Sequence, residues 1–162
     1  MSYTYYDYAE NDYNFIMNNY KSGGVWNSMC SISQQICERY IRHIIDKYYM
    51  PDNQNDCVEA SEVLRTHNLN KLERFLKKKM SITFEENVHN ALTEINGFYF
   101  ETRYPGDESF FADKEDIENA VNGIKLCKET IDKIIAEKEK QIKENTTEKE
   151  TEKTTDEEIE LE

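Results

Sequence analysis

The stretch from residue 25 to residue 49 constrains the fold most, because its apolar side chains recur at helical spacing along its whole length. The main apolar stripe is formed by Trp26, Met29, Cys30, Ile36, Cys37, Tyr40, Ile44 and Tyr48. It is widened by Ile32, Ile41 and Ile45, so we expect a central helix that is buried on more than one side.

Two polar rows accompany the apolar stripe of this predicted helix. One row consists of Gln34, Glu38 and Arg42, and the other consists of Gln35, Arg39 and His43. Side chains four residues apart share a helix face and commonly form salt links at a protein surface. We therefore expect both rows to face solvent.

Helical spacing also describes the remaining apolar residues. Further helices are predicted over residues 4–20, 57–65, 66–79, 84–103 and 114–135. Pro105 is expected to end the helix over residues 84–103, and Asp113 is expected to cap the last one. No segment alternates apolar and polar residues as a strand does. The sequence thus predicts an all-α fold, an antiparallel up-and-down bundle of about five helices with a charged C-terminal tail.

Composition divides the chain into a folded body and a tail. We expect residues 1–136 to form one helical domain and residues 137–162 to form an acidic tail rich in Glu, Lys and Thr. The tail holds 11 acidic residues and five lysines, so we expect it to be partly helical or disordered. The formal net charge of the whole chain is −13, which argues against a general nucleic-acid binder.

Cysteine usage and hydropathy bear on the compartment. There is no Cys-x-x-Cys pair, and Cys30, Cys37 and Cys127 fall on predicted apolar helix faces. The N-terminus has no apolar signal segment, and no apolar run reaches the length of a membrane span. We therefore expect a cytoplasmic protein with reduced thiols. The three histidines are scattered along the sequence, so we predict no metal site. The sequence has no glycine-rich phosphate loop, so we predict no cofactor.

A candidate binding site lies at residues 98–107, where a predicted helix ends. Tyr99 and Arg103 are four residues apart on one helix face, and Tyr104 and Asp107 flank the Pro-Gly turn that follows. A guanidinium held in this way is suited to a phosphate or a carboxylate group. The alternative is that Arg103 only caps the helix and pairs with Asp107, because basic residues are favoured at helix C-termini in any case.

A second cationic feature is the run Lys77, Lys78 and Lys79 at the end of the helix predicted over residues 66–79. Lysines can contact phosphate groups, but cations at a helix C-terminus are also ordinary. We expect this run to be a solvated helix end.

Three segments, in order, resemble the HEPN domain family. Residues 31–39 are similar to its "QQ-x-x-E-K" helix, with Arg39 in the place of the usual lysine. Residues 66–72 look like its "H-[DN]-L-x-x-L" helix, and residues 101–107 resemble the "R-Y-P" segment before its final helix. The order and spacing match over about residues 4–136.

The resemblance implies a helical bundle that forms a homodimer, with a cleft near the Arg-bearing segment. Family members include ribonuclease toxins, partners of small nucleotidyltransferases, and nucleotide-binding modules. The candidate ligand-binding residues are accordingly Arg103, Tyr99, Tyr104 and Asp107, together with Gln35 and Arg39 of the "QQ-x-x-E-K" segment.

The resemblance also bears on catalysis. Ribonuclease members carry an Arg and, with four to six residues between, a His that together act on the ribose 2′-hydroxyl. After Arg103 the corresponding positions hold Glu108, Ser109 and Phe110, so we assign no catalytic residue.

We therefore expect a non-catalytic module that binds a nucleotide, RNA or another anionic ligand, or a protein partner such as a minimal nucleotidyltransferase. One alternative is a ribonuclease toxin of a toxin–antitoxin system, in which Arg103 acts with His43 or His67 brought close in space. Another is a purely structural helical adaptor.

Overall fold

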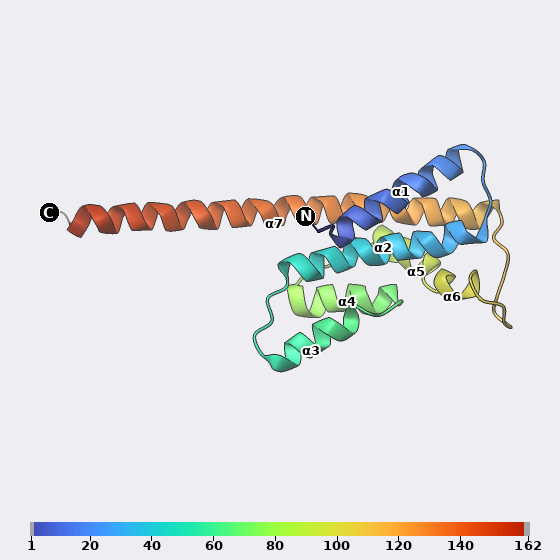
Figure 1. Ribbon diagram of the computed structural model, residues 1–162, viewed down its shortest axis with the longest axis horizontal. Helices are drawn as coiled ribbons and strands as arrows, with labels where there is room; N and C mark the ends of the chain where they lie inside the picture. Colours follow the sequence, from blue (N-terminus) through green and yellow to red (C-terminus); the bar gives the residue numbers. More distant parts are fainter. Residues whose placement is uncertain (1, 161–162) are drawn as a thin grey trace. The chain divides into compact units, whose positions relative to one another are not determined.

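The structure, a computed structural model, describes residues 2–160, and most of them are helical (Figure 1). The helices are α1 (Tyr5–Lys21), α2 (Asn27–Tyr48), α3 (Gln54–Val63), α4 (Leu69–Met80), α5 (Glu86–Ile95), α6 (Phe98–Glu101) and α7 (Lys114–Glu160). No strand occurs among the described residues, so the predicted all-α helical bundle is confirmed. The chain forms two compact units, Met1–Ile131 and Asp132–Glu162.

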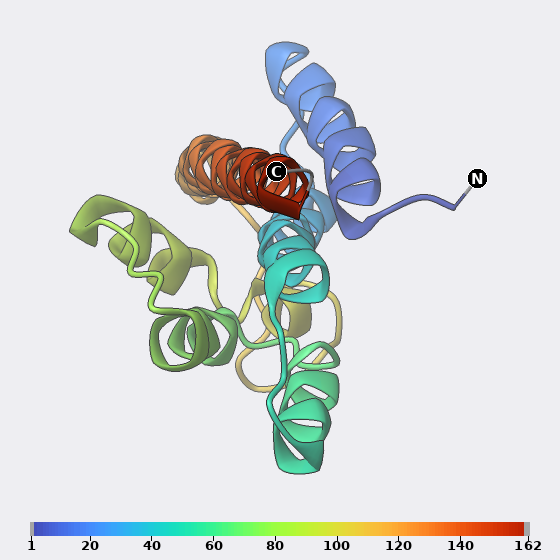
Figure 2. The same cartoon turned by 90° about the vertical axis from the view of Figure 1, so that its left-hand side faces the viewer.

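Helix α2 is the centre of the first unit. It packs against α1 on one side and against α4, α5 and α6 elsewhere on its surface (Figures 1 and 2). Its apolar stripe is buried from Met29 to Ile45, as predicted, except that Ile32 is partly exposed. Trp26, which the sequence placed in the same stripe, is 65% exposed, so the prediction is wrong for this residue. The first turns of α7 complete the core, and Gly123 allows α7 to approach α5 closely, since an added Cβ would lie 3.1 Å from Ile95 Cδ1.

Cysteine burial in this core agrees with the sequence. The thiols of Cys30, Cys37 and Cys127 are free and buried, whereas Cys57 is exposed. Burial raises the pKa of the Cys30 thiol to about 12, so this sulfur behaves as a small apolar group rather than as a nucleophile.

The N-terminal aromatic residues join α1 to α2 and to the start of α7. The Tyr6 and Tyr40 rings meet edge to face, with centroids 5.5 Å apart. The Tyr40 hydroxyl donates to Glu10 Oε1 at 2.5 Å, and Lys128 Nζ donates to the same oxygen at 2.6 Å. This face of α1 therefore packs through its rings and satisfies its polar tips, as expected for a core face.

Side-chain caps set the helix boundaries. Thr4 and Asp7 form a capping box at the start of α1. Asn68 Oδ1 accepts a hydrogen bond from Lys71 N at the start of α4. Asp113 Oδ1 accepts one from Asp116 N at the start of α7, which confirms the predicted cap.

The prediction of a single helix over residues 84–103 is wrong, because Asn96 and Gly97 divide this segment into α5 and α6. Gly97 has a φ of 106°, in the left-handed region that glycine tolerates best. Asn96 leaves helical geometry, and its Oδ1 accepts a hydrogen bond from Leu69 N at 2.9 Å. The break therefore serves a second purpose, which is to cap the start of α4.

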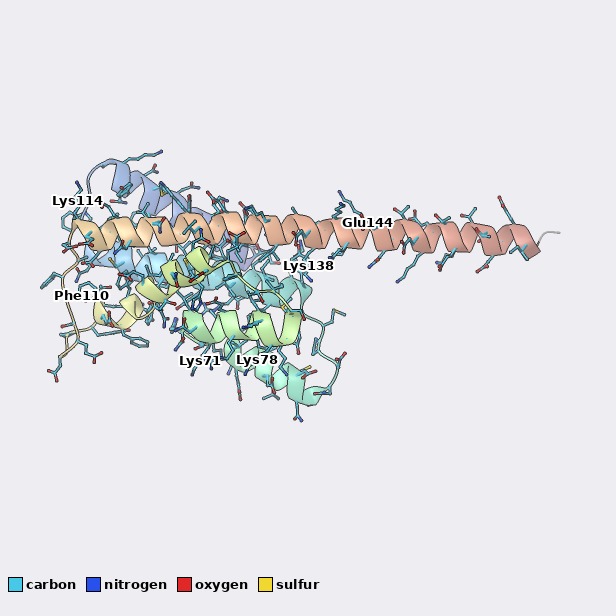
Figure 3. The ribbon with its side chains drawn as sticks, turned by 180° about the vertical axis from the view of Figure 1, so that it is seen from behind. Lys71, Lys78, Phe110, Lys114, Lys138 and Glu144 are labelled. Atoms are coloured by element: carbon cyan, nitrogen blue, oxygen red, sulfur yellow. The ribbon has the colours of Figure 1, made fainter. Side chains whose placement is uncertain are left out.

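The second unit consists of the later turns of α7, which include the labelled residues Lys138 and Glu144 (Figure 3). Every described side chain from Lys140 to Ile159 is exposed, so these turns depend on helix propensity and on contacts within the helix itself. The domain boundary expected near residue 136 stays a prediction. Within residues 2–160, every helix is too short or too polar to span a membrane.

Candidate functional site

The polar row Gln34, Glu38 and Arg42 lies inside the first unit. The exposed fractions of these residues are 0%, 0% and 9%, so the prediction that this row faces solvent was wrong. The row faces two non-helical segments, the approach to α4 and the α5–α6 break. Backbone groups in such segments lack helical partners and must be satisfied by other donors and acceptors.

Gln34 and Arg42 supply those partners. Gln34 Oε1 accepts hydrogen bonds from Gly97 N at 3.1 Å and from Tyr99 N at 2.7 Å. Gln34 Nε2 donates to the backbone oxygen of His67 at 2.9 Å. Arg42 Nη2 donates to the backbone oxygen of Thr66 at 2.6 Å. Two side chains of α2 thus fix the segments that precede α4 and α6.

Glu38 occupies the middle of this row. Its Oε1 accepts a hydrogen bond from Gln34 Nε2 at 3.1 Å, and its Oε2 lies 3.3 Å from Arg42 Nη2 and 3.1 Å from His67 Nδ1. Three partners compensate a carboxylate that has no exposed surface. With Nδ1 of His67 directed at this carboxylate, Nε2 is the ring nitrogen left to face a ligand.

His67 begins a series of stacked groups that extends from the buried row to the surface. The His67 and Tyr99 rings stack with centroids 4.1 Å apart and an interplanar angle of 8°. The guanidinium carbon of Arg103 lies 4.9 Å from the centre of the Tyr99 ring and 5.7 Å from that of Tyr104. Together with Phe100, these residues form what we call the aromatic platform, which consists of His67, Tyr99, Phe100, Arg103 and Tyr104.

Two rings of the aromatic platform are accessible to a ligand. Phe100 is 56% exposed and Tyr104 is 51% exposed. Their ring centroids lie 6.3 Å apart. Large aromatic side chains that stay half exposed on a rigid support are suited to stacking against a planar partner.

Arg103 stands beyond α6, whose C-cap is Thr102. Its guanidinium is exposed, and it forms no ion pair with Asp107 or with any other carboxylate in the part of the chain that the structure describes. The alternative in which Arg103 pairs with Asp107 therefore receives no support. An arginine held by two rings and lacking a counter-ion can accept an external anion.

The other candidate ligand-binding residues lie elsewhere. Arg39 pairs with Asp12 of α1 and also contacts Gln35 at 3.5 Å, so these two residues belong to the α1–α2 contact. Asp107 is exposed and contributes no described contact to the aromatic platform. The structure thus brings Arg103, Tyr99 and Tyr104 together but does not join Gln35 and Arg39 to them.

The structure also distinguishes between the two histidines considered as partners of Arg103. His43 is buried against Tyr6 and Tyr48, with ring centroids 5.5 and 6.5 Å away. Burial lowers the pKa of His43, and the charge of Lys47 adds to this effect. His67, by contrast, is separated from the Arg103 guanidinium by a single ring, that of Tyr99.

The loop that carries Arg103 is closed at its base by Asn27, the first residue of α2. Asn27 Nδ2 donates to the backbone oxygens of Thr102 at 3.4 Å and Phe110 at 2.9 Å. Asn27 Oδ1 accepts a hydrogen bond from Ala112 N at 2.6 Å. A single side chain therefore binds both ends of the loop.

Two neighbouring phenylalanines at the end of this loop differ in burial. Phe110, labelled in Figure 3, packs against Phe98 with ring centroids 5.8 Å apart. Phe111, by contrast, is 92% exposed. The backbone hydrogen bonds to Asn27 direct Phe110 inward and leave its neighbour outside.

Sequence reasoning did not assign Gln34, Glu38 or His67 to the predicted ligand-binding set. A signal was present, because Glu38 belongs to the "QQ-x-x-E-K" segment and His67 to the "H-[DN]-L" segment, but spacing alone does not pair distant motifs. In residues 2–160, no three His, Cys, Asp or Glu side chains converge so that they could hold a metal ion.

Comparisons with known proteins agree with this architecture. The model of the HEPN domain family matches residues 57–140, which is just over half of the chain and includes His67, Tyr99 and Arg103. No curated protein and no solved structure matches the chain.

Proposed function

Because the chain belongs to the HEPN domain family, we propose that it is a non-catalytic HEPN module that binds a nucleotide or another phosphate-bearing ligand on the aromatic platform. The observation that carries this proposal is the state of Arg103. Its guanidinium lies 4.9 Å from the Tyr99 ring and has no carboxylate partner among the described residues.

The platform offers two complementary contacts to a nucleotide. The exposed rings of Phe100 and Tyr104 would stack on a base, which is favourable for every base because each has a π-face. The planar fork of Arg103 would hold a phosphate through two parallel hydrogen bonds. Gln34 fixes the backbone of Tyr99, Glu38 orients the His67 ring, and the Tyr99 ring stacks on His67. These side chains are therefore ordered before a ligand binds, which lowers the entropy cost of binding.

A ribonuclease is the second candidate, and the pairing of Glu38 with His67 favours it specifically. A carboxylate that orients an imidazole through Nδ1 is the usual support of a general base. In this alternative, His67 Nε2 would take the proton of a ribose 2′-hydroxyl while Arg103 held the phosphate. The strongly acidic chain opposes this candidate, because a polyanionic substrate gains from positive charge around the site.

Titration of labelled nucleotides and of a short RNA with wild-type protein and Arg103→Ala tests the main proposal. Arg65→Ala is the matched control, since Arg65 is an exposed arginine whose loss changes the net charge equally. We expect Arg103→Ala to weaken binding about tenfold or more, as the loss of a charge-assisted hydrogen bond implies. Arg103→Lys should restore little, because a point charge lacks the planar fork. Equal binding by all four proteins would refute the proposal.

Substitutions at Tyr99 probe the support of Arg103. Tyr99→Phe keeps the ring between His67 and Arg103, so we expect a small effect on nucleotide affinity. Tyr99→Ala removes the stacking surface of both neighbours and should weaken binding more. If the two variants bound equally well, stacking on Tyr99 would have no part in positioning Arg103.

A cleavage assay on the same RNA separates the two candidate functions. The binding module predicts no cleavage by the wild-type protein. Cleavage that disappears in both His67→Gln and Arg103→Ala would replace the binding module with the ribonuclease. If wild-type protein neither bound nor cleaved any probe, the structural adaptor would become the better account.

A protein partner belongs to the same proposal. We propose that a minimal nucleotidyltransferase is a candidate partner, because some HEPN proteins act together with such enzymes. A nucleotidyltransferase encoded beside this chain, and its co-purification with the chain, would support the pairing. Failure of the two proteins to co-purify would count against it.

A further inference from the structure

A second cationic site lies between α4 and α5, on residues outside the aromatic platform. These helices and the link between them border an open hollow of about 750 Å³. We call it the α4–α5 groove. Its polar lining consists of Asn70, Arg74, Lys77, Lys78, Thr83, His89 and Thr93, together with the carboxylates Glu73 and Glu86.

The three cations of the α4–α5 groove have no anionic partner. Arg74, Lys77 and Lys78 are exposed, and none forms an ion pair with a carboxylate in the described residues. The neighbouring Lys79 behaves differently, since its Nζ lies 2.9 Å from Glu59 and 3.5 Å from Asp56. Among the basic residues of α4, Lys79 is thus the one that pairs with a carboxylate in the described part of the chain.

Charge is also concentrated in α4. The helix holds five basic residues and one acidic residue, although the chain as a whole has a net charge of −13. The helix dipole accounts for cations in the last turn, but Arg74 lies one turn earlier. Arg74 also shares one helix face with Lys77 and Lys78, where like charges repel one another unless an anion is bound. The expectation of a merely solvated helix end thus leaves Arg74 unexplained.

One titratable group of the α4–α5 groove, His89, is also held in a fixed orientation. His89 Nδ1 lies 2.8 and 2.9 Å from the two carboxylate oxygens of Glu73, which fixes the ring and leaves Nε2 for an external contact. His89 remains half exposed, at 51% of its side-chain surface.

We propose that the α4–α5 groove binds a run of phosphate groups. Arg74, Lys77 and Lys78 would neutralise successive phosphates along one face of α4, and His89 would contact them from α5. The same phosphate chemistry occurs in a free polyphosphate and in an oligonucleotide backbone. The groove is independent of the aromatic platform, because it uses neither Arg103 nor His67.

The test is a titration of the full-length protein with two probes, inorganic tripolyphosphate and a labelled single-stranded ten-nucleotide RNA, a length of about the usual site size. The groove variant is Lys77→Gln with Lys78→Gln. The matched control is Lys114→Gln with Lys125→Gln, because these exposed lysines of α7 lie outside the groove and their loss changes the net charge equally. Lys78 on α4 and Lys114 at the start of α7 are both marked in Figure 3.

We expect at least one probe to bind the wild-type protein, the groove variant to bind it at least tenfold more weakly, and the control variant to stay within about twofold. Arg74→Gln and His89→Gln should each weaken binding as well. Binding of tripolyphosphate alone would identify a small phosphate ligand, whereas binding of RNA in addition would identify a nucleic-acid backbone. Either result supports the proposal.

Several outcomes would overturn it. Equal losses in the groove variant and the control variant would show that overall charge, and not the groove, governs binding. Failure of the wild-type protein to bind either probe, or preferential binding of a polyglutamate peptide, would also reject a phosphate site. Arg103→Ala should leave the binding of tripolyphosphate unchanged, because this probe has no base to stack on the aromatic platform. Failure of the groove is therefore distinguishable, through this probe, from failure of the aromatic platform.

Discussion

His67 Nδ1 lies 3.1 Å from Oε2 of Glu38, a residue with no exposed surface. The pair connects the buried row of α2 to the stacked groups that reach Arg103. The same carboxylate also accepts hydrogen bonds from Arg42 and Gln34. The position of the surface site is therefore fixed by polar bonds inside the fold as well as by apolar packing.

Glu38→Gln is expected to lower the free energy of unfolding by about 3 kcal/mol, because Arg42 would then be buried without its counter-charge. Chemical denaturation followed by circular dichroism measures this change. Glu118→Gln is the control, since Glu118 is exposed on α7, and its effect should stay within about 0.5 kcal/mol. Equal stability of the two variants would mean that Glu38 does not compensate Arg42.

Asn27→Ala should release the loop that carries Arg103. The change removes the side-chain partner of Thr102 O, Phe110 O and Ala112 N, and each buried group left unsatisfied costs about 1–3 kcal/mol. Hydrogen exchange at Ala112 N–H should accelerate, and proteases should cut the loop more readily. Ser28→Ala, next in the chain and exposed, should change neither readout.

Stability should depend on pH through His43. Burial lowers the pKa of His43 in the folded protein below its ordinary value of 6.5, with Lys47 adding to the shift and Asp46 and Asp7 opposing it. The unfolded chain therefore binds a proton first as the pH falls through 6.5, and the free energy of unfolding decreases there. His43→Phe keeps an aromatic ring against Tyr6 but does not titrate. As the pH is lowered from about 7.5 to 5.5, the free energy of unfolding should fall more steeply for the wild-type protein than for this variant.

Truncation after residue 140 should leave the helical body intact. The removed turns carry only exposed side chains over their described length, and such a helix contributes little without packing. Thermal melting followed by far-ultraviolet circular dichroism should give the same cooperative transition for both chains. A truncated chain that no longer melts cooperatively would contradict the proposed boundary near residue 136.

We also propose that the chain forms a homodimer. The family resemblance implies it, and exposed aromatic residues such as Tyr8, Phe15 and Trp26 offer apolar surface that a second copy would cover. Light scattering at tens of micromolar protein should report twice the mass of the chain. A monomeric mass at that concentration would contradict the proposal.

The sequence predicted the elements that depend on local chemistry. The apolar stripe of α2 identified a central helix, and Asp113 marked the start of α7. The α5–α6 break was missed although an Asn-Gly dipeptide is a turn signal, because the apolar periodicity continues across it from Ile95 to Phe98.

The site itself was only half predictable. Tyr99 and Arg103 are close in sequence, so helical spacing paired them. The contact of His67 with Tyr99 depends on how α4 and α6 pack against α2, and no local pattern reports it. Likewise, periodicity groups Gln34 with Glu38 and Gln35 with Arg39. It does not show that the first pair is buried next to backbone groups without helical partners, or that Arg39 of the second pair binds Asp12.

Asn27 has a consequence for how such a protein changes over evolutionary time. Because one side chain closes the loop at its base, the residues within the loop contribute little to the stability of the bundle. A mutation in the loop should therefore mainly affect ligand binding. Glu108 and Ser109, two of the three positions at which the family resemblance would place a ribonuclease histidine, are both exposed. A histidine introduced at either position should therefore leave the fold intact. A substitution scan scored only for soluble folded protein should accordingly be permissive at residues 103–109 and restrictive at Asn27.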